Sequence, residues 1–279
     1  MSGPTLLTVA PTGAESAKAD VPALPTTPEE LVETAVACEQ AGAAVVHIHV
    51  RDARHEPTLD AGLLREAVVG VREATDLVVQ LSTGGSVTDP LERRLTVLDA
   101  EPDACSLTCG TTNFGDGVFL NPWGFLVELY RQTQDRQVVP EFELFELGHV
   151  QALSRLLDEC GLPHGGKVHV DFVTGVPGGM PGTPQALLAG VAMLPPEVTS
   201  WSATGIGRAH LPIAATALAA GGHLRVGMED NLVYAKGRRV AHNRELEARA
   251  AELATLLQRP PMSPAQAREL LGVKERRTR

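Results

Sequence analysis

Residues 27–50 read TPEELVETAVACEQAGAAVVHIHV, in which a helix pattern leads directly into a strand pattern. Thr27 offers an N-cap hydroxyl, Pro28 suits the first helical turn, and Glu30 can bond back to the cap. The apolar residues that follow share one helical face, and the β-branched run at 44–50 is typical of a buried strand. A helix joined in this way to a buried strand indicates a parallel α/β protein.

The same alternation repeats along the chain. Eight short apolar runs predict strands, at 6–10, 44–50, 77–82, 104–108, 138–145, 167–173, 199–203 and 224–227. Helical patterns begin at Thr27 and recur at about 63–74, 123–134, 150–160, 183–193, 208–220 and 245–257. These repeats predict a (β/α)8 TIM barrel that forms one domain over residues 1–279, with a short extra C-terminal helix between Ser263 and Gly272. An open doubly wound sheet is the alternative, but no G-x-G-x-x-G motif opens the first helix.

Composition narrows the class of protein. The chain has 279 residues, of which 43% are apolar, and its 24 basic and 34 acidic residues give a net charge of −10. Such a charge argues against partners such as nucleic acid or an anionic membrane surface. No apolar run approaches the roughly 18 residues of a membrane span, the N-terminus lacks a signal-peptide pattern, and the four cysteines show no CxxC spacing. We therefore expect a cytoplasmic protein that acts on small molecules.

His47 and His49 are the sharpest candidates for chemistry. They stand two apart at the end of a predicted strand, so both imidazoles point to one face, where neutral histidines are preferred zinc ligands. A third ligand is expected at the end of a neighbouring strand, and the last strand ends beside Glu229 and Asp230. Either carboxylate could complete the site and leave the other free as a base. The alternatives are a hydrogen-bonded histidine beside a surface histidine, and a solvated acidic turn.

Other strand ends carry weaker signals. Ser82 and Gly85 belong to a turn that can bind a carboxylate or carbonyl oxygen, and Ser106 and Thr108 alternate along the next strand. The glycine-rich segment after the sixth strand, at 172–183, is typical of a loop over the mouth of a barrel. Two further segments could bind an anion: GIGR at 205–208 leads into a helix N-terminus, and KGRR at 236–239 is a basic cluster that is otherwise an ordinary surface.

Eight motifs in one order resemble the β-keto acid cleavage enzyme family over nearly the whole chain. They are TGAE at 12–15, HIHVR at 47–51, QLSTGG at 80–85, NFGD at 113–116, GVPGG at 175–179, GIGR at 205–208, GGHLRVGMEDN at 221–231 and PAQARELL at 264–271. The resemblance implies a zinc-bearing (β/α)8 barrel, usually a homotetramer. It also implies an acyltransferase that condenses a β-keto acid with acetyl-CoA to give acetoacetate and a new acyl-CoA.

The resemblance also assigns the reacting groups. Zinc would be held by His47, His49 and Glu229, and it would stabilise the enolate by binding the keto oxygen. Arg225 and Asp230 match a catalytic pair that takes the proton between ketone and carboxylate. An arginine is a poor base, because its pKa lies above about 12. We therefore assign the proton to Asp230 and expect Arg225 to orient it and the substrate carboxylate.

The remaining matches concern substrate binding. Ser82, Gly85 and Ser106 would surround the substrate carboxylate and the reacting oxygens, with Ser82 close to the chemistry. Glu15 and Glu143 match positions at the distal end of the substrate, and a carboxylate at position 15 pairs with an amino group in members that act on an amino-bearing acid.

Thr108 is a departure from the family pattern, because family members usually carry asparagine there. The hydrogen-bonding side chain is therefore shorter, and its role in holding the substrate is in question.

Two other functions compete with this one. A zinc hydrolase of the amidohydrolase type also uses H-x-H on a barrel strand, although on the first strand and with later histidines as ligands. A metal-dependent binding protein could keep the fold without the chemistry, but it would have no need of Arg225, Asp230 and Ser82 together. Two histidines and one carboxylate could also hold cobalt, nickel or manganese.

Overall fold

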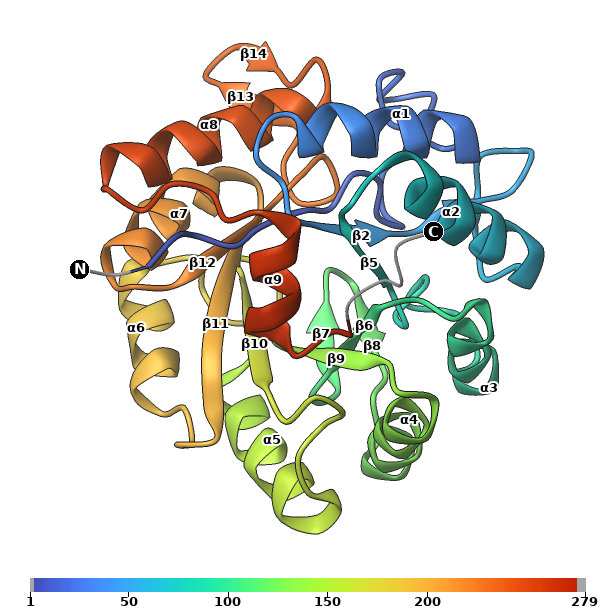
Figure 1. The fold of residues 1–279 in the computed structure, drawn as a ribbon, viewed down its shortest axis with the longest axis vertical. Coiled ribbons are helices and arrows are strands. Elements are labelled where there is room, and N and C mark those ends of the chain that lie inside the picture. Colours follow the sequence, from blue (N-terminus) through green and yellow to red (C-terminus); the bar gives the residue numbers. More distant parts are fainter. Residues whose placement is uncertain (1–2, 275–279) are drawn as a thin grey trace.

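The computed structural model describes residues 3–274, in which eight parallel strands close into a barrel (Figure 1). Around the barrel the order of strands is β1-β12-β11-β10-β9-β6-β5-β2. Their bounds are β1 Leu7–Val9, β2 Val45–Ile48, β5 Val78–Leu81, β6 Ala104–Thr108, β9 Val139–Leu144, β10 Val168–Thr174, β11 Val198–Gly205 and β12 His223–Val226. Each of the eight predicted strands corresponds to one of these, so the predicted (β/α)8 barrel is confirmed and the open sheet is excluded.

Helices connect the strands and surround them (Figure 1). Their bounds are α1 Pro28–Glu39, α2 Ala61–Ala74, α3 Leu91–Leu95, α4 Trp123–Arg136, α5 Leu147–Cys160, α6 Pro184–Ala192, α7 His210–Ala219, α8 Asn243–Leu256 and α9 Pro264–Leu271, with 3-10 turns η1 Thr96–Ala100 and η2 Gly207–Ala209. The predicted N-terminus of α1 is confirmed, because the Thr27 hydroxyl accepts a hydrogen bond from Glu30 N at 3.2 Å and the Glu30 carboxylate accepts from Thr27 N.

The structure adds elements that the sequence patterns did not predict. These are α3 with η1, and three two-stranded ribbons, β3 (Val50–Arg51) with β4 (Pro57–Thr58), β7 (Thr112–Phe114) with β8 (Gly117–Phe119), and β13 (Val233–Ala235) with β14 (Arg238–Arg239). The predicted strand at 44–50 divides at His49, because the residues after it pair with β4 outside the barrel. A β-branched run indicates a strand but does not say which strand it pairs with.

The extra C-terminal helix, α9, closes the N-terminal end of the barrel (Figure 1). Its side chains Ala267 and Leu271 are buried in one apolar cluster with the beginnings of five strands, through Leu6, Val45, Val78, Ala104 and Val139. Arg268 fixes the helix further, since its guanidinium donates to the Asp103 carboxylate at 3.0 Å. One end of the barrel is therefore sealed, and the C-terminal end is left for a site.

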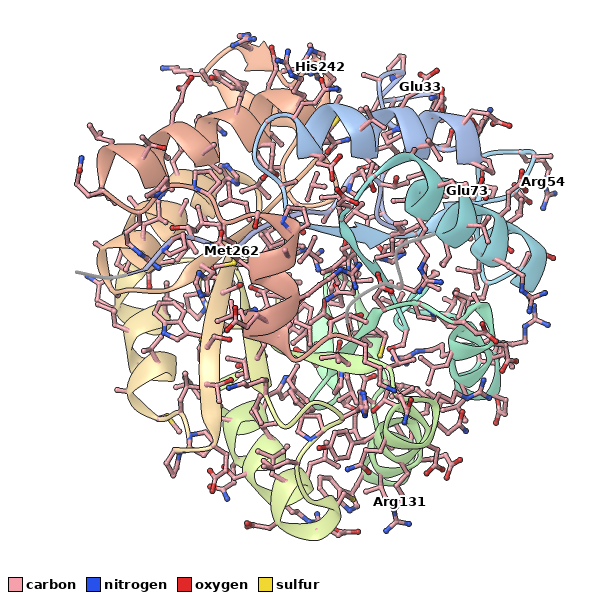
Figure 2. The ribbon with its side chains drawn as sticks, viewed as in Figure 1. Glu33, Arg54, Glu73, Arg131, His242 and Met262 are labelled. Atoms are coloured by element: carbon pink, nitrogen blue, oxygen red, sulfur yellow. The ribbon has the colours of Figure 1, made fainter. Side chains whose placement is uncertain are left out.

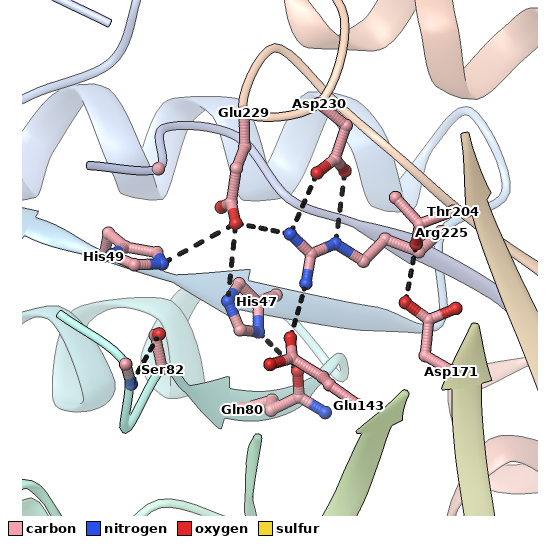
Figure 3. Close-up of polar contacts among 12 residues, drawn as sticks. His47, His49, Gln80, Ser82, Glu143, Asp171, Thr204, Arg225, Glu229 and Asp230 are labelled. Carbon is pink, nitrogen blue, oxygen red and sulfur yellow. Dashed lines mark hydrogen bonds and ion pairs between the residues drawn. The ribbon is translucent and has the colours of Figure 1, made fainter. Parts of the chain in front are cut away.

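The interior of the barrel is polar towards its open end. Buried side chains from four strands contact one another there: Arg225 of β12 reaches Glu143 of β9, and Thr204 of β11 reaches Asp171 of β10 (Figure 3). TIM barrels usually fill this space with branched apolar side chains. Buried charges are costly unless they are paired, so this network points to function. In the described part of the chain, no helix is long and apolar enough to cross a membrane.

Candidate active site

His47, His49 and Glu229 meet at the open end of the barrel (Figure 3). His47 lies on β2 and His49 directly after it, whereas Glu229 follows β12, and β1 lies between these two strands. Glu229 Oε1 is 3.8 Å from His47 Nε2 and 3.6 Å from His49 Nε2. One possible ligand atom from each of these three side chains lies within 4.8 Å of the other two. Within residues 3–274, no other group of three or more histidine, cysteine, aspartate or glutamate side chains meets that distance.

The donor set fits a divalent metal. Nitrogen and oxygen ligands of a tetrahedral zinc ion lie about 2.0–2.1 Å from it, which places them roughly 3.3 Å apart, close to the separations found here. Gln80 Oε1 accepts a hydrogen bond from His47 Nδ1, which leaves the Nε2 lone pair facing Glu229. Glu229 Oε2 is buried and no hydrogen-bond partner for it exists among the described residues. Two imidazoles and one carboxylate could therefore hold the metal.

Arg225 links this group to two more carboxylates. Its Nε and Nη2 donate to both oxygens of Asp230 at 3.1 and 3.0 Å, and its Nη1 donates to Glu143 Oε1 at 3.0 Å. Nη2 also forms a short contact with Glu229 Oε1. The Arg225 side chain is only 4% exposed, so the guanidinium is held in one orientation by three carboxylates.

Burial and this arginine set the charges of the site. Burial lowers the pKa of His47 to about 3, with help from Arg225, so the imidazole is neutral. Burial raises the pKa of Glu229, but Arg225 and the two histidines outweigh it and leave that pKa at about 2. At Asp230 burial outweighs Arg225 and raises the pKa to about 7. Glu229 is therefore an anion ready for a cation, and Asp230 can exchange a proton near neutral pH.

A cavity of about 520 Å³ opens over these groups. Its polar lining includes His47, His49, Glu143, Arg225, Glu229 and Asp230, together with Ser82 and Gly85. The rest of the lining is mostly apolar, with Phe114, Phe119, Phe145, Val173 and Val176, and it carries two further carboxylates, Glu15 and Asp116. The arrangement offers a group of possible metal ligands, a proton acceptor and an arginine in one pocket for a small molecule.

The turn at 82–85 reaches the cavity as the sequence predicted. The Ser82 hydroxyl accepts a hydrogen bond from Gly84 N at 3.1 Å. Gly85 has a positive φ of 60°, and a side chain there would meet the Asp89 carboxylate at 2.3 Å, so the turn needs glycine.

The structure does not bring Ser106 and Thr108 to the cavity wall. Thr108 Oγ1 instead donates to Glu143 Oε2 at 2.7 Å and so holds the carboxylate that Arg225 also contacts. Ser106 lies two residues earlier on β6, beside Glu141 in register, and is therefore nearer the closed end. Both residues are buried. Thr108 thus supports the site through Glu143.

Three residues that hold the site in place were not singled out from the sequence. Gln80 orients His47, as described above. Arg51 donates to the carbonyl oxygens of Gly13 (2.7 Å) and Ser16 (3.0 Å), and so fixes the segment that carries Glu15. Alternation along β5 could have revealed Gln80, which stands two residues before Ser82 on the same face.

Arg94 is the third of these residues. It is buried, and it joins the 82–85 turn to the β7–β8 ribbon by donating to Thr83 O (2.7 Å) and to Leu120 O (2.7 Å). No pattern in the sequence indicates that Arg94 is buried.

The glycine-rich loop after β10 covers part of the cavity, as predicted. Val176 and Pro177 line the cavity, and Pro177 O accepts a hydrogen bond from Gly115 N of the β7–β8 ribbon at 2.9 Å. A side chain at Gly178 would approach Asn113 Cβ to 2.7 Å, so only glycine allows the loop and the ribbon to pack this closely. The loop and the ribbon form one wall.

Comparisons with known proteins identify relatives of this chain. A family model described as beta-keto acid cleavage enzyme matches residues 4–273. The 3-keto-5-aminohexanoate cleavage enzyme of Acetoanaerobium sticklandii is 36% identical over 270 residues, which cover 96% of this chain and 98% of that protein. The 3-oxoadipate:acetyl-CoA acetyltransferase of Cupriavidus necator is 34% identical over 281 residues, 98% of this chain and 96% of that protein.

A solved structure supports the fold alone. The ternary complex of ObcA with a C4-CoA adduct and oxalate has a TM-score of 0.77 and 21% sequence identity, and the match covers 90% of this chain and 68% of that one.

Proposed function

This chain belongs to the beta-keto acid cleavage enzyme family, and from that membership we propose that it condenses a β-keto acid with acetyl-CoA to give acetoacetate and a new acyl-CoA. The protein is therefore an enzyme. We propose its co-substrate, its metal and the roles of its residues. The two relatives described above support the reaction type, since one is named as a β-keto acid cleavage enzyme and the other as an acetyl-CoA acetyltransferase.

One observation carries the proposal. The metal-binding group of His47, His49 and Glu229 lies directly beside the Arg225–Asp230 pair, with Arg225 Nη2 in contact with both carboxylates. Removal of a proton from the carbon between a ketone and a carboxylate needs an electrophile for the ketone oxygen and a base near that carbon. Zinc, when bound there, supplies the Lewis acid.

The residues of the chain perform the remaining steps. Asp230 accepts the proton from the carbon between the two carbonyl groups, and its pKa of about 7 suits this exchange. Arg225 keeps Asp230 in position and attracts the substrate carboxylate, while Ser82 and Gly85 line the opposite side of the cavity. The carbanion attacks the acetyl carbonyl of acetyl-CoA, and the thiolate of CoA leaves.

The second half of the reaction restores the thioester. The thiolate attacks the other ketone, the carbon–carbon bond beside that ketone breaks, and Asp230 returns the proton to the carbanion released. The products are acetoacetate, whose acetyl group comes from acetyl-CoA, and the acyl-CoA of the remaining fragment. No water is consumed, so an enclosed cavity favours this transfer over hydrolysis.

The cavity lining favours a neutral or cationic distal group in the substrate. Among the described residues that line it, Arg225 is the only lysine or arginine, and three carboxylates already contact it. The distal part carries Glu15 and Asp116 among phenylalanines, so a second substrate carboxylate would find no cation there. We therefore propose an amino-bearing β-keto acid in preference to a dicarboxylic one.

Three further proposals concern the domain organisation, the assembly and the location of the enzyme. We propose a single barrel domain over residues 1–279, assembled as a homotetramer in the cytoplasm, as the resemblance implies. Light scattering of the purified protein tests the assembly. The amidohydrolase-type alternative is not favoured, because the family and the relatives are β-keto acid cleavage enzymes and Glu229, which follows the last barrel strand, completes the metal group.

A panel of substrates tests the proposal. The zinc-loaded protein is mixed with acetyl-CoA and neutral, dicarboxylic or amino-bearing β-keto acids, and acetoacetate and new acyl-CoA are followed by mass spectrometry. We expect both products in equal amounts, with the highest kcat/KM for an amino-bearing acid and a loss of preference in Glu15→Gln. No product from any acid, with metal bound and the fold intact, would contradict the proposed reaction.

A further inference from the structure

A second cavity, of about 560 Å³, adjoins the active site, and most of its lining has no part in the chemistry described so far. It shares Ile206, Glu229 and Asp230 with the catalytic cavity and continues past them to the β13–β14 ribbon and the beginning of α7. The two cavities therefore meet at the catalytic carboxylates and extend in different directions from them.

Three cations line this second cavity, although the protein as a whole carries a net charge of −10. They are Arg208 in η2, Lys236 in the turn of the β13–β14 ribbon, and Arg249 on α8. Within residues 3–274, none of the three forms an ion pair with a carboxylate of the protein. Among the described residues, Glu229 and Asp230 are the only carboxylates in the lining, and they lie where the cavity joins the active site.

Two hydrogen-bond donors of Arg249 have no partner among the described residues. Its Nη1 donates to Tyr234 O at 2.5 Å, and its guanidinium lies 4.3 Å from the centre of the Tyr234 ring. Its Nε and Nη2 are buried, and neither has a hydrogen-bond partner in the described chain. Unused buried donors on a cation are costly unless a ligand satisfies them, and an anionic group is the natural ligand.

We infer that this second cavity binds the phosphorylated nucleotide end of acetyl-CoA. The inference rests on the proposed function and extends it to a site for the coenzyme. Acetyl-CoA has a neutral thioester at one end and three phosphate groups at the other, and this cavity has catalytic groups at one end and unpaired cations at the other. The apolar Ile206, Leu211 and Leu232 lie in its lining, where the uncharged pantetheine arm can pass.

The arrangement separates the two substrates. The β-keto acid occupies the catalytic cavity, where Glu15 and Asp116 would attract its distal amino group, and the phosphates of the coenzyme are attracted to the cations of the second cavity. Both reach Glu229 and Asp230, where the acetyl group must meet the carbanion. Charge alone thus keeps the polyanionic coenzyme out of the pocket that carries Glu15 and Asp116.

The test uses the zinc-loaded enzyme with the double substitution Arg208→Ala/Lys236→Ala, in which both side chains are exposed. The matched control is Arg54→Ala/Arg131→Ala, which removes two cations from other sides of the molecule (Figure 2). Kinetics are measured with acetyl-CoA and with S-acetylpantetheine, which has the same thioester but no phosphate. Calorimetry measures the binding of adenosine 3′,5′-bisphosphate, a fragment of CoA, without any need for turnover.

We expect KM for acetyl-CoA to rise about tenfold or more in Arg208→Ala/Lys236→Ala, with kcat nearly unchanged. KM for S-acetylpantetheine and for the β-keto acid should not change, the control variant should behave as the wild type, and bisphosphate binding should weaken about tenfold. Arg249→Met, which keeps an unbranched side chain but removes the guanidinium, should weaken bisphosphate binding further.

An unchanged KM for acetyl-CoA in an active double variant would overturn the inference and leave the proposed function intact. If instead the wild type turns over no β-keto acid, the proposed function fails and the calorimetry still decides. Bisphosphate binding that is lost in the double variant and kept in the control supports the cationic cavity as its site. Equal binding in both variants, or none to the wild type, contradicts it.

Discussion

The two ends of the barrel differ in the polarity of their side chains. At the N-terminal end, α9 packs on apolar side chains from five strands, whereas at the C-terminal end Arg225 contacts three carboxylates and two histidines lie beside them. Apolar burial stabilises a fold in proportion to the area removed from water. Buried charges at best offset their own desolvation. We therefore expect the closed end to supply stability and the open end to supply chemistry.

Glu229→Ala should give the largest effect, because it removes a metal ligand at the open end. We expect kcat/KM to fall by about a thousandfold or more, with loss of bound zinc. The free energy of unfolding of the metal-free protein should be nearly unchanged. Turnover assays, metal analysis and chemical denaturation check these three expectations. A variant that keeps both zinc and activity would remove Glu229 from the metal site.

Leu271→Ala should show the opposite pattern at the closed end. Leu271 is buried in the α9 cluster, and a large-to-small change of this kind leaves a cavity. We expect the free energy of unfolding to fall by about 3 kcal/mol while kcat per folded molecule stays the same. Leu256→Ala on α8 is the control, since that side chain is 76% exposed and should change stability by less than about 0.5 kcal/mol.

A buried carboxylate outside the barrel, unlike those around Arg225, forms no ion pair among the described residues, and a pH titration of stability tests its effect. Glu247 on α8 is fully buried, neither of its oxygens has a partner among the described residues, and burial raises its pKa from 4.5 to about 8. The unfolded chain then loses this proton near pH 4.5 and the folded chain near pH 8, so the unfolded state binds fewer protons between these values. Stability must therefore fall as the pH rises through this range.

Glu247→Gln should remove that part of the pH dependence. Between pH 5 and 8 the wild type should lose about 3 kcal/mol more of its unfolding free energy than the variant does. Denaturant unfolding curves at a series of pH values measure the difference. Parallel curves for the two proteins would show that Glu247 does not titrate in this way.

Gln80→Leu should have the smallest effect of the four and tests how the open end is organised. The substitution removes the acceptor for His47 Nδ1 and leaves all three proposed ligands in place. We expect zinc affinity to fall by about tenfold, as is usual when the partner of a ligand histidine is lost. Competition with a chelator measures it, and Gln80→Glu should restore most of the loss because it returns an acceptor.

The sequence predicts the closed barrel well and the details of the open end less well. The eight strands follow from β-branched runs, and the α1 cap follows from Thr27 and Glu30, because these signals are local. His47 and His49 are found because they stand at a strand end, whereas strand ends alone leave Glu229 and Asp230 as alternatives for the third ligand and the resemblance selects Glu229. Long-range partners carry no such mark in one sequence: nothing local indicates that Thr108 binds Glu143 or that Arg94 is buried.

The second cavity shows the same limit. The segments at 205–208 and 236–239 are visible in the sequence as possible anion sites, but only the fold shows that Arg208 and Lys236 line one cavity with Arg249. The residue with the unused donors, Arg249, lies inside an ordinary helix pattern and gives no signal. The sequence alone therefore does not show which distant residues the closed barrel brings together, and the structure is needed for that.

The most direct test of the central claim uses acetyl-CoA labelled with ¹³C at both acetyl carbons, together with the best β-keto acid of the panel. The account predicts that both labels appear at C3 and C4 of acetoacetate, that the new acyl-CoA is unlabelled, and that Glu229→Ala forms neither product. Labelled acetate with no labelled acetoacetate, or cleavage of the β-keto acid without CoA, would contradict it and indicate a hydrolase.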